Sequence, residues 1–223
     1  MRASLAPRLD FERPNAEPRG TAIDLRFRAL LPEGDWAKLS PAVQRRFSKR
    51  LANGATAVYV GEVREMYLNP LGWLLTQLLR LVGGPLPTSL ATNVPSIVTV
   101  TEDMKSGGQI WTRLYVRRDG FPQVIHSCKR FAGATGLEEY VGFGIGMALT
   151  ISVVEATLVF RSANYFFQLG NWRIPLPKWL TPGEIVVSHQ ELSSDQFLFT
   201  LDVVHPRFGL LVHQPAAFRE SHP

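Results

Sequence analysis

The polar side chains best suited to chemistry lie in two short motifs. One motif places Glu139 just before a long apolar run, and the other, SHQEL, places His189 and Glu191 two residues apart. Residues two apart on a strand share a face, so this pair could act in acid–base chemistry or supply two zinc ligands. A metal needs three or four ligands, and the further histidines nearby in the sequence are His205 and His213. We therefore predict neither a metal site nor a cofactor, and convergence of His189, Glu191, His205 and His213 on a metal is the alternative.

Four residues are candidates for acid–base catalysis: Glu139, Glu191, His126 and His205. His126 lies two residues before Cys128, which is the single cysteine, and a nucleophilic dyad at this spacing competes with a buried, inert thiol, which we favour. The sequence contains no Gly-x-Ser-x-Gly signature. One cysteine excludes an internal disulfide and fits a reducing compartment, so we expect a cytoplasmic location.

A ligand pocket is indicated by the segment IWTRLYV, which places Trp111, Arg113 and Tyr115 on one face of a strand. An arginine among aromatic rings could hold a carboxylate inside an apolar pocket. The alternative is an outward face on which the arginine covers apolar surface. The other ligand-binding candidates are Trp73, Met147, Thr150 and His213.

The apolar run VGFGIGMALTISVVEATLVF, residues 141–160, decides the fold class. A transmembrane helix would bury Glu155, at a cost of about 2.5–3.5 kcal/mol. A dinucleotide loop needs a helix directly after its glycines, whereas β-branched residues follow here. Bulky residues at the odd positions 145–153 alternate with small ones, which predicts a strand and the start of a second. The small face borders either a ligand cavity or a neighbour's side chains.

The remaining elements are β-strands with a few helices. Ser40 and Asn69 are N-cap residues, each followed by a proline at the first helical position. The second helix, about 70–82, spans roughly 20 Å, too short for a bilayer, and is predicted to be a lid. Sequential strands follow it, separated by Gly, Pro, Asn, Asp and Ser. We predict a mainly β (α+β) fold, an antiparallel β-barrel or strongly curved sheet, calycin-like or helix-grip-like, over residues 23–223, after a flexible arm at 1–22.

The net charge of +5 lies in the first part of the chain. Residues 1–53 contain 11 Lys and Arg against 6 Asp and Glu, whereas residues 54–223 contain 13 of each. The body of the chain therefore lacks a basic stripe for nucleic acid, and we predict no nucleic-acid partner. The basic face around Arg45, Arg46, Lys49 and Arg50 could make weak contact with a membrane surface, although a solvated face is the favoured alternative. The N-terminus lacks the apolar stretch of a signal peptide.

Three segments, NWRIPLPKWL, SHQEL and HPRFGLLVHQ, resemble a bacterial family, domain of unknown function 4166. Members of this family stand alone or follow a reductase of the saccharopine-dehydrogenase type. The resemblance extends from about Phe27 to Phe218, and its most specific part matches four residues: His205, Pro206, Gly209 and His213. It implies no particular activity. The fusion partner suggests small-molecule metabolism by association.

These observations predict binding of an apolar small molecule, lipid-like or polyketide- or terpenoid-like, inside the barrel. One alternative is a cofactor-independent isomerase or cyclase that acts on a hydrophobic molecule through few polar groups. The other is a peripheral membrane-associated protein that uses the basic helix and the Trp73 helix. The sequence does not indicate an oligomeric state.

Overall fold

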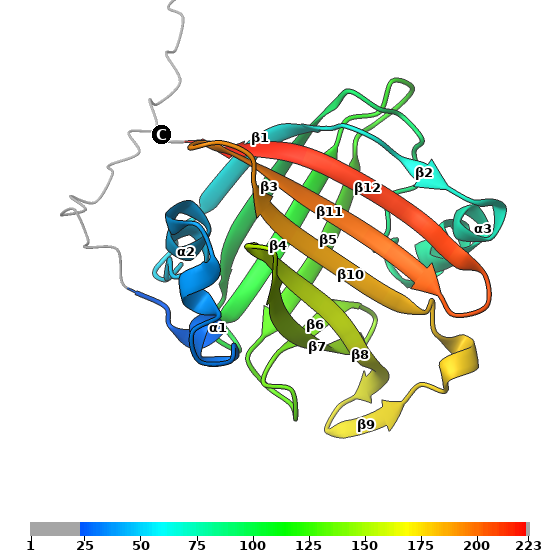
Figure 1. Cartoon of the computed structure of the whole chain (residues 1–223). Coiled ribbons are helices and arrows are strands. Elements are labelled where there is room, and N and C mark those ends of the chain that lie inside the picture. Colours follow the sequence, from blue (N-terminus) through cyan, green and yellow to red (C-terminus); the bar gives the residue numbers. More distant parts are fainter. Residues whose placement is uncertain (1–22, 222–223) are drawn as a thin grey trace, which may run out of the picture.

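The chain forms a closed antiparallel β-barrel of ten strands (Figure 1). The computed structural model describes residues 23–221, and the arm predicted over residues 1–22 lies outside them. In pairing order the barrel strands are β1 (Ala57–Val63), β3 (Val94–Asp103), β4 (Gly108–Tyr115), β5 (Gln123–Arg130), β6 (Glu138–Gly142), β7 (Ile145–Val154), β8 (Thr157–Leu169), β10 (Glu184–Glu191), β11 (Gln196–His205) and β12 (Gly209–Glu220). Strand β12 pairs with β1 and closes the barrel, which confirms the predicted fold class.

The other elements are short and lie at the barrel ends. Strand β2 (Tyr67–Leu68) pairs with β12, and β9 (Trp172–Pro175) pairs with β8. The helices are α1 (Arg26–Ala29), α2 (Pro41–Phe47) and α3 (Pro70–Leu79), with 3-10 turns η1 (Trp36–Lys38), η2 (Arg80–Val82) and η3 (Lys178–Leu180). Among residues 23–221, no helix combines the length and apolar character that crossing a bilayer requires.

Both predicted N-caps are present. The Ser40 side chain accepts a hydrogen bond from the Val43 amide at 3.3 Å, and Asn69 accepts one from the Gly72 amide at 2.7 Å. These bonds satisfy backbone donors that have no partner within the helix. Helix α3 and η2 together cover the predicted 70–82 helix, and Gly83 ends it with a left-handed φ of 98°.

The run at residues 141–160 forms β7 and the start of β8, as the alternation predicts. The bulky residues Met147, Leu149 and Ile151 point inward and are buried, so the small face points outward, and of its residues Gly146 alone also lines an interior cavity. An added Cβ at Gly146 would lie 2.6 Å from the Phe166 ring packed on the outer face. Gly146 therefore makes room for a ring outside the barrel, whereas Thr150 on the same face is exposed to solvent.

The two barrel ends differ in the helices that cover them, and we name each end by its helix (Figure 1). The α2 end consists of segments 23–56, 104–107, 131–137, 155–156 and 192–195, and the α3 end of segments 64–93, 116–122, 142–144, 169–183 and 205–208. At the α2 end, the Phe27 ring lies 5.3 Å from Phe47 and 4.9 Å from Phe131. Helix α3 instead lies along β12, where Gly72 packs against the Leu211 carbonyl.

Candidate ligand-binding site in the barrel interior

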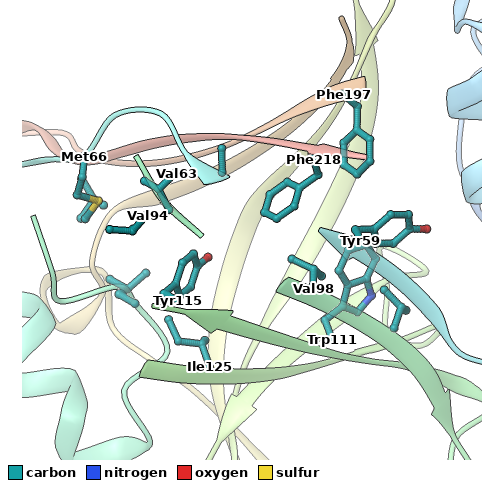
Figure 2. Close-up of a cluster of buried hydrophobic side chains, with 14 of the residues drawn as sticks. Tyr59, Val63, Met66, Val94, Val98, Trp111, Tyr115, Ile125, Phe197 and Phe218 are labelled. Carbon is teal, nitrogen blue, oxygen red and sulfur yellow. The ribbon is translucent and has the colours of Figure 1, made fainter. Parts of the chain in front are cut away.

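A cavity of about 140 Å³ opens inside the barrel toward the α3 end. Its outer part is lined by apolar side chains from the loops of that end, including Leu79, Leu86, Leu176, Leu180 and Pro182. A second space of about 30 Å³ lies nearer α2. Arg113, Tyr115 and Phe199 line both spaces and so form the partition between them. Figure 2 shows Tyr115 beside Ile125, with Trp111 on the far side of Val98. We call the larger space the outer cavity and the smaller one the inner cavity.

Inward residues of β4, β5 and β6 place a charged cluster at the floor of the outer cavity. The Lys129 ammonium donates a hydrogen bond to Glu139 Oε2 at 2.9 Å. The Arg113 guanidinium donates to Ser127 Oγ at 3.2 Å, and its Nη2 lies 3.6 Å from Glu139 Oε1. Alternation along each strand puts these four side chains on the inner face, where they meet across neighbouring strands.

The cluster holds Glu139 in its ionised form. Burial by itself would raise the pKa of Glu139, but the charges of Lys129 and Arg113 outweigh burial and lower this pKa to about 2. For Lys129 burial is the stronger effect, and it lowers the pKa of the ammonium group despite the attraction of Glu139. At neutral pH, with all three groups charged, two positive charges face one negative charge. A second anion would therefore be stabilised beside them.

A second polar group borders the inner cavity. The Arg46 Nη1 lies 2.7 Å from His189 Nε2, and its Nη2 lies 3.5 Å from Glu191 Oε2. The His189 ring stacks on Phe197 at 4.4 Å, and the Arg46 guanidinium lies 4.0 Å from the centre of the same ring. Burial, helped by the charge of Arg46, lowers the pKa of His189 well below 6.5, so this imidazole is neutral. Since Arg46 can only donate, the proton of neutral His189 lies on Nδ1.

Three polar atoms of this group are buried without a hydrogen-bond partner: Arg46 Nε, His189 Nδ1 and Glu191 Oε1. An unsatisfied buried polar atom costs about 1–3 kcal/mol, so such atoms normally mark a place for water or a ligand. A water needs roughly 10–15 Å³ of such space. The inner cavity, at about 30 Å³, can therefore hold one or two waters or the polar end of a small molecule.

The sequence matches one family model, described as Domain of unknown function (DUF4166), over residues 39–218. The chain belongs to this family. Comparisons with curated proteins and with solved structures returned no match. The DUF4166 match begins just before α2 and ends within β12, so it includes the other nine barrel strands, most of β12 and every residue that lines the two cavities, whereas α1 lies outside it.

The DUF4166 barrel places five of the predicted site residues around its interior. Trp111, Arg113 and Tyr115 share the inward face of β4, and Glu139 and Met147 line the outer cavity from β6 and β7. The predicted common face of the β4 residues is therefore the inward one. Glu191 lies near the inner cavity, paired with Arg46.

The other predicted residues lie away from the cavities. Thr150 is exposed on the outer face, where its hydroxyl donates to the Arg161 carbonyl. His126 is also exposed and contacts Thr112, while His213 pairs with Asp202 at 2.6 Å. His205 is the last residue of β11, beside the turn to β12, and Trp73 is half exposed on α3.

The four catalytic candidates do not converge. Glu139 lies in the interior, Glu191 beside α2, His126 on the outer face and His205 at the α3 end. Within the part of the chain that the structure describes, no three His, Cys, Asp or Glu side chains converge in a way that could hold a metal ion. Burial raises the pKa of Cys128 to about 11, so its thiol stays protonated and gives no nucleophile beside His126.

Sequence reasoning missed Ser127 and Lys129, although a signal for both was present. In QVIHSCKRF the residues Ile125, Ser127 and Lys129 alternate with His126 and Cys128. The more reactive pair, His126 and Cys128, lies on the outward face of this strand, and Ser127 and Lys129 lie on the inward face. For Arg46 the sequence gave no comparable signal, because it lies in a run of basic residues on a helix whose other face is apolar.

Proposed function

We propose that this barrel binds an apolar small molecule that carries an anionic group. The charged cluster at the cavity floor supports this most directly: Arg113 and Glu139 line the outer cavity, and Lys129 contacts Glu139 from outside the cavity lining, so with all three groups charged the cluster has one positive charge in excess. The guanidinium of Arg113 borders both cavities and donates a single side-chain hydrogen bond within residues 23–221, to Ser127. Its planar array of N–H groups suits a carboxylate.

The apolar part of the ligand would lie toward the α3 end. There the cavity wall consists of leucine and proline side chains, together with Ile145 and Met147 from β7. An engineered apolar cavity of roughly 150 Å³ accommodates benzene. The outer cavity is of similar volume and would accept one ring or the end of an aliphatic chain.

Binding accounts for the charged cluster better than acid–base catalysis does. A general base works best when its pKa lies near the working pH. The pKa of Glu139 is about 2, so the carboxylate is a weak proton acceptor at neutral pH. Its charge instead keeps Lys129 and Arg113 in place within the apolar interior.

Titration calorimetry with octanoate and 1-octanol tests the proposal, because the two molecules differ in their head group and share an eight-carbon chain. We expect octanoate to bind at least about tenfold more tightly, a difference of about 1.4 kcal/mol. Arg113→Met should remove this preference. Arg161→Met, on the outer face, is the matched control. Equal affinity of wild type for the two molecules would contradict the anionic head group.

A second variant tests whether the ligand binds in the outer cavity, and it leaves the charge of the protein unchanged. Met147→Trp should fill the outer cavity and abolish binding of octanoate. Met104→Trp makes the same kind of change at a side chain that is 92% exposed, and it should bind as wild type does. Circular dichroism confirms that each variant is folded. Unchanged binding by folded Met147→Trp would place the ligand elsewhere and overturn the proposed site.

A further inference from the structure

Exposed apolar side chains are concentrated at the α3 end of the barrel. Of the large hydrophobic residues that are exposed in residues 23–221, fifteen lie in the segments of the α3 end and four in those of the α2 end. All seven exposed aromatic residues of the described chain lie at the α3 end: Tyr67, Trp73, Phe121, Phe143, Trp172, Trp179 and Phe208. Exposed patches of this kind mark surfaces that contact another molecule or a membrane.

Helix α3 and η2 show how this surface is built. Gly72 and Thr76 are buried toward the barrel, and Leu75 and Leu79 pack against its core. Leu71, Leu74, Leu78 and Leu81 follow one another at helical spacing on the outward face and are exposed. An amphipathic helix in water would carry polar residues on that face, so both faces of this helix are apolar.

The same surface is positively charged. The segments of the α3 end contain seven Lys and Arg residues against two Asp and Glu residues. Five of the cations form no ion pair within the described residues: Arg80, Arg117, Arg118, Lys178 and Arg207. Burying an apolar surface against a neutral protein partner would leave these charges unpaired, whereas anionic lipid head groups would pair with them.

We propose that the α3 end docks on the surface of a bilayer that contains anionic phospholipid. Tryptophan and tyrosine favour the boundary between head groups and acyl chains, where Trp73, Trp172 and Trp179 would lie. Helix α3 would lie in the plane of that boundary with its outward leucines toward the acyl chains. The unpaired arginines and Lys178 would contact phosphate groups.

The position of the outer cavity would allow this surface to deliver a ligand from the bilayer to the barrel. Leu79 and Leu180 line the cavity from the segments that carry the exposed residues, so its mouth faces the proposed membrane contact. An apolar ligand could pass between bilayer and barrel without exposure to water. This use rests on the proposed function, whereas the docking surface itself does not.

The α2 end is also net positive, but it carries four exposed large hydrophobic residues and no exposed aromatic one within the described residues, so we assign the membrane contact predicted from both helices to the α3 end alone. Helices α2 and α3 lie at opposite ends of the barrel (Figure 1), and one flat surface cannot contact both. Of the four basic residues predicted for membrane contact, exposed Arg45 forms no ion pair within the described residues, whereas Arg46 pairs with Glu191 and Lys49 with Glu220. Arg50 pairs with Glu102.

Sedimentation with vesicles tests the docking surface on the full chain. Vesicles of phosphatidylcholine alone are compared with vesicles of equal parts phosphatidylcholine and phosphatidylglycerol. We expect at least about tenfold stronger binding to the anionic vesicles, and loss of that preference in Arg117→Gln/Arg118→Gln. Wild type that stays in the supernatant with anionic vesicles would overturn the proposal.

A combined variant, Leu74→Gln/Leu78→Gln/Trp179→Ser, tests the apolar part and should lower binding to anionic vesicles at least about tenfold. Its control is Met104→Ser/Leu192→Ser, which changes exposed residues of the α2 end and should bind like wild type. Equal sedimentation of the combined variant and wild type would overturn docking through the α3 end. A wild-type dimer in light scattering that the combined variant abolishes would also overturn it, by assigning the patch to a second copy.

The two proposals fail separately. The combined variant leaves the charged cluster intact, so it should still bind octanoate in solution while it loses vesicle binding. Wild type that binds vesicles but no octanoate would retain the docking surface and reject the ligand. Wild type that binds octanoate but not vesicles would retain the proposed ligand and reject the docking surface.

Discussion

The two ends of the barrel are each covered by a helix, but the outer surfaces of the two helices differ. Each end is covered by a helix that begins at a side-chain cap followed by proline. At the α2 end, Val43 and Phe47 point into an aromatic core, and Arg46 and Lys49 are held in ion pairs. At the α3 end the helix leaves leucines on its outer face, and unpaired cations surround them.

This difference suggests that the two ends of the barrel have different roles. The α2 end excludes solvent through close aromatic contacts, which is what a stable core requires. The α3 end leaves apolar surface in water, which weakens solubility and gives no stability in return. We infer that the α2 end stabilises the fold, and that the α3 end is shaped for a partner.

The largest difference in stability should follow from truncating one side chain at each end. Phe27, at the α2 end, is 1% exposed, and Phe27→Ala should destabilise the protein by about 3–5 kcal/mol because it leaves a cavity among aromatic rings. Leu78→Ala, on the outer face of α3, should change stability by less than about 0.5 kcal/mol. Urea unfolding measures both. Similar losses in the two variants would show that the ends do not differ in this way.

Acid should lower the stability of the protein through the charged cluster of Arg113, Lys129 and Glu139, which lies between the two ends. The folded-state pKa of Glu139 is about 2, below its ordinary value of 4.5, so the stability from its ionisation is present above that ordinary value and is lost as pH falls toward 2. We expect a loss of order 2–4 kcal/mol over this range. The change should be much smaller in Glu139→Gln/Lys129→Met. Glu184→Gln, which removes an exposed carboxylate, should keep the wild-type acid response.

Local patterns in the sequence predicted most of the fold. Alternation of bulky and small residues identified β7, and the two caps located α2 and α3, because these signals come from backbone geometry and nearest neighbours. Which face of each strand points into the barrel was harder to predict. Gly146 of β7 packs beneath the Phe166 ring outside the barrel, and that contact depends on the register with β8, which also contains an irregularity between Ala148 and Leu149.

The sequence could group residues of the candidate site only where they alternate along a single strand. Trp111, Arg113 and Tyr115 share a face within a single segment, and the structure places them together. Lys129 and Glu139 meet because β5 pairs with β6 in one particular register, which a sequence pattern does not fix. Arg46 reaches His189 across 143 positions of the chain, and only the closed barrel brings α2 against β10.

Mild acid should distinguish the α2 end from the outer surface. The pKa of His189 is lowered well below 6.5 by burial and by Arg46, so the unfolded chain binds a proton that the folded chain does not. Stability is therefore full above pH 6.5 and falls below it, with a slope of at most about 1.4 kcal/mol per pH unit. His189→Phe should flatten this slope and keep the stacking on Phe197, as urea unfolding at several pH values would show. His126→Phe, on the outer surface, should not flatten it.

The helix caps offer the smallest and most local comparison. Ser40→Ala and Asn69→Ala each remove one capping hydrogen bond, which costs about 1 kcal/mol. Because α2 is part of the aromatic core, Ser40→Ala should lower the global stability measured by urea. Helix α3 is anchored through few buried side chains, so Asn69→Ala should instead speed amide hydrogen exchange in α3 and leave exchange in the barrel strands unchanged. An equal loss of global stability in both variants would mean that α3 unfolds together with the barrel and belongs to its core.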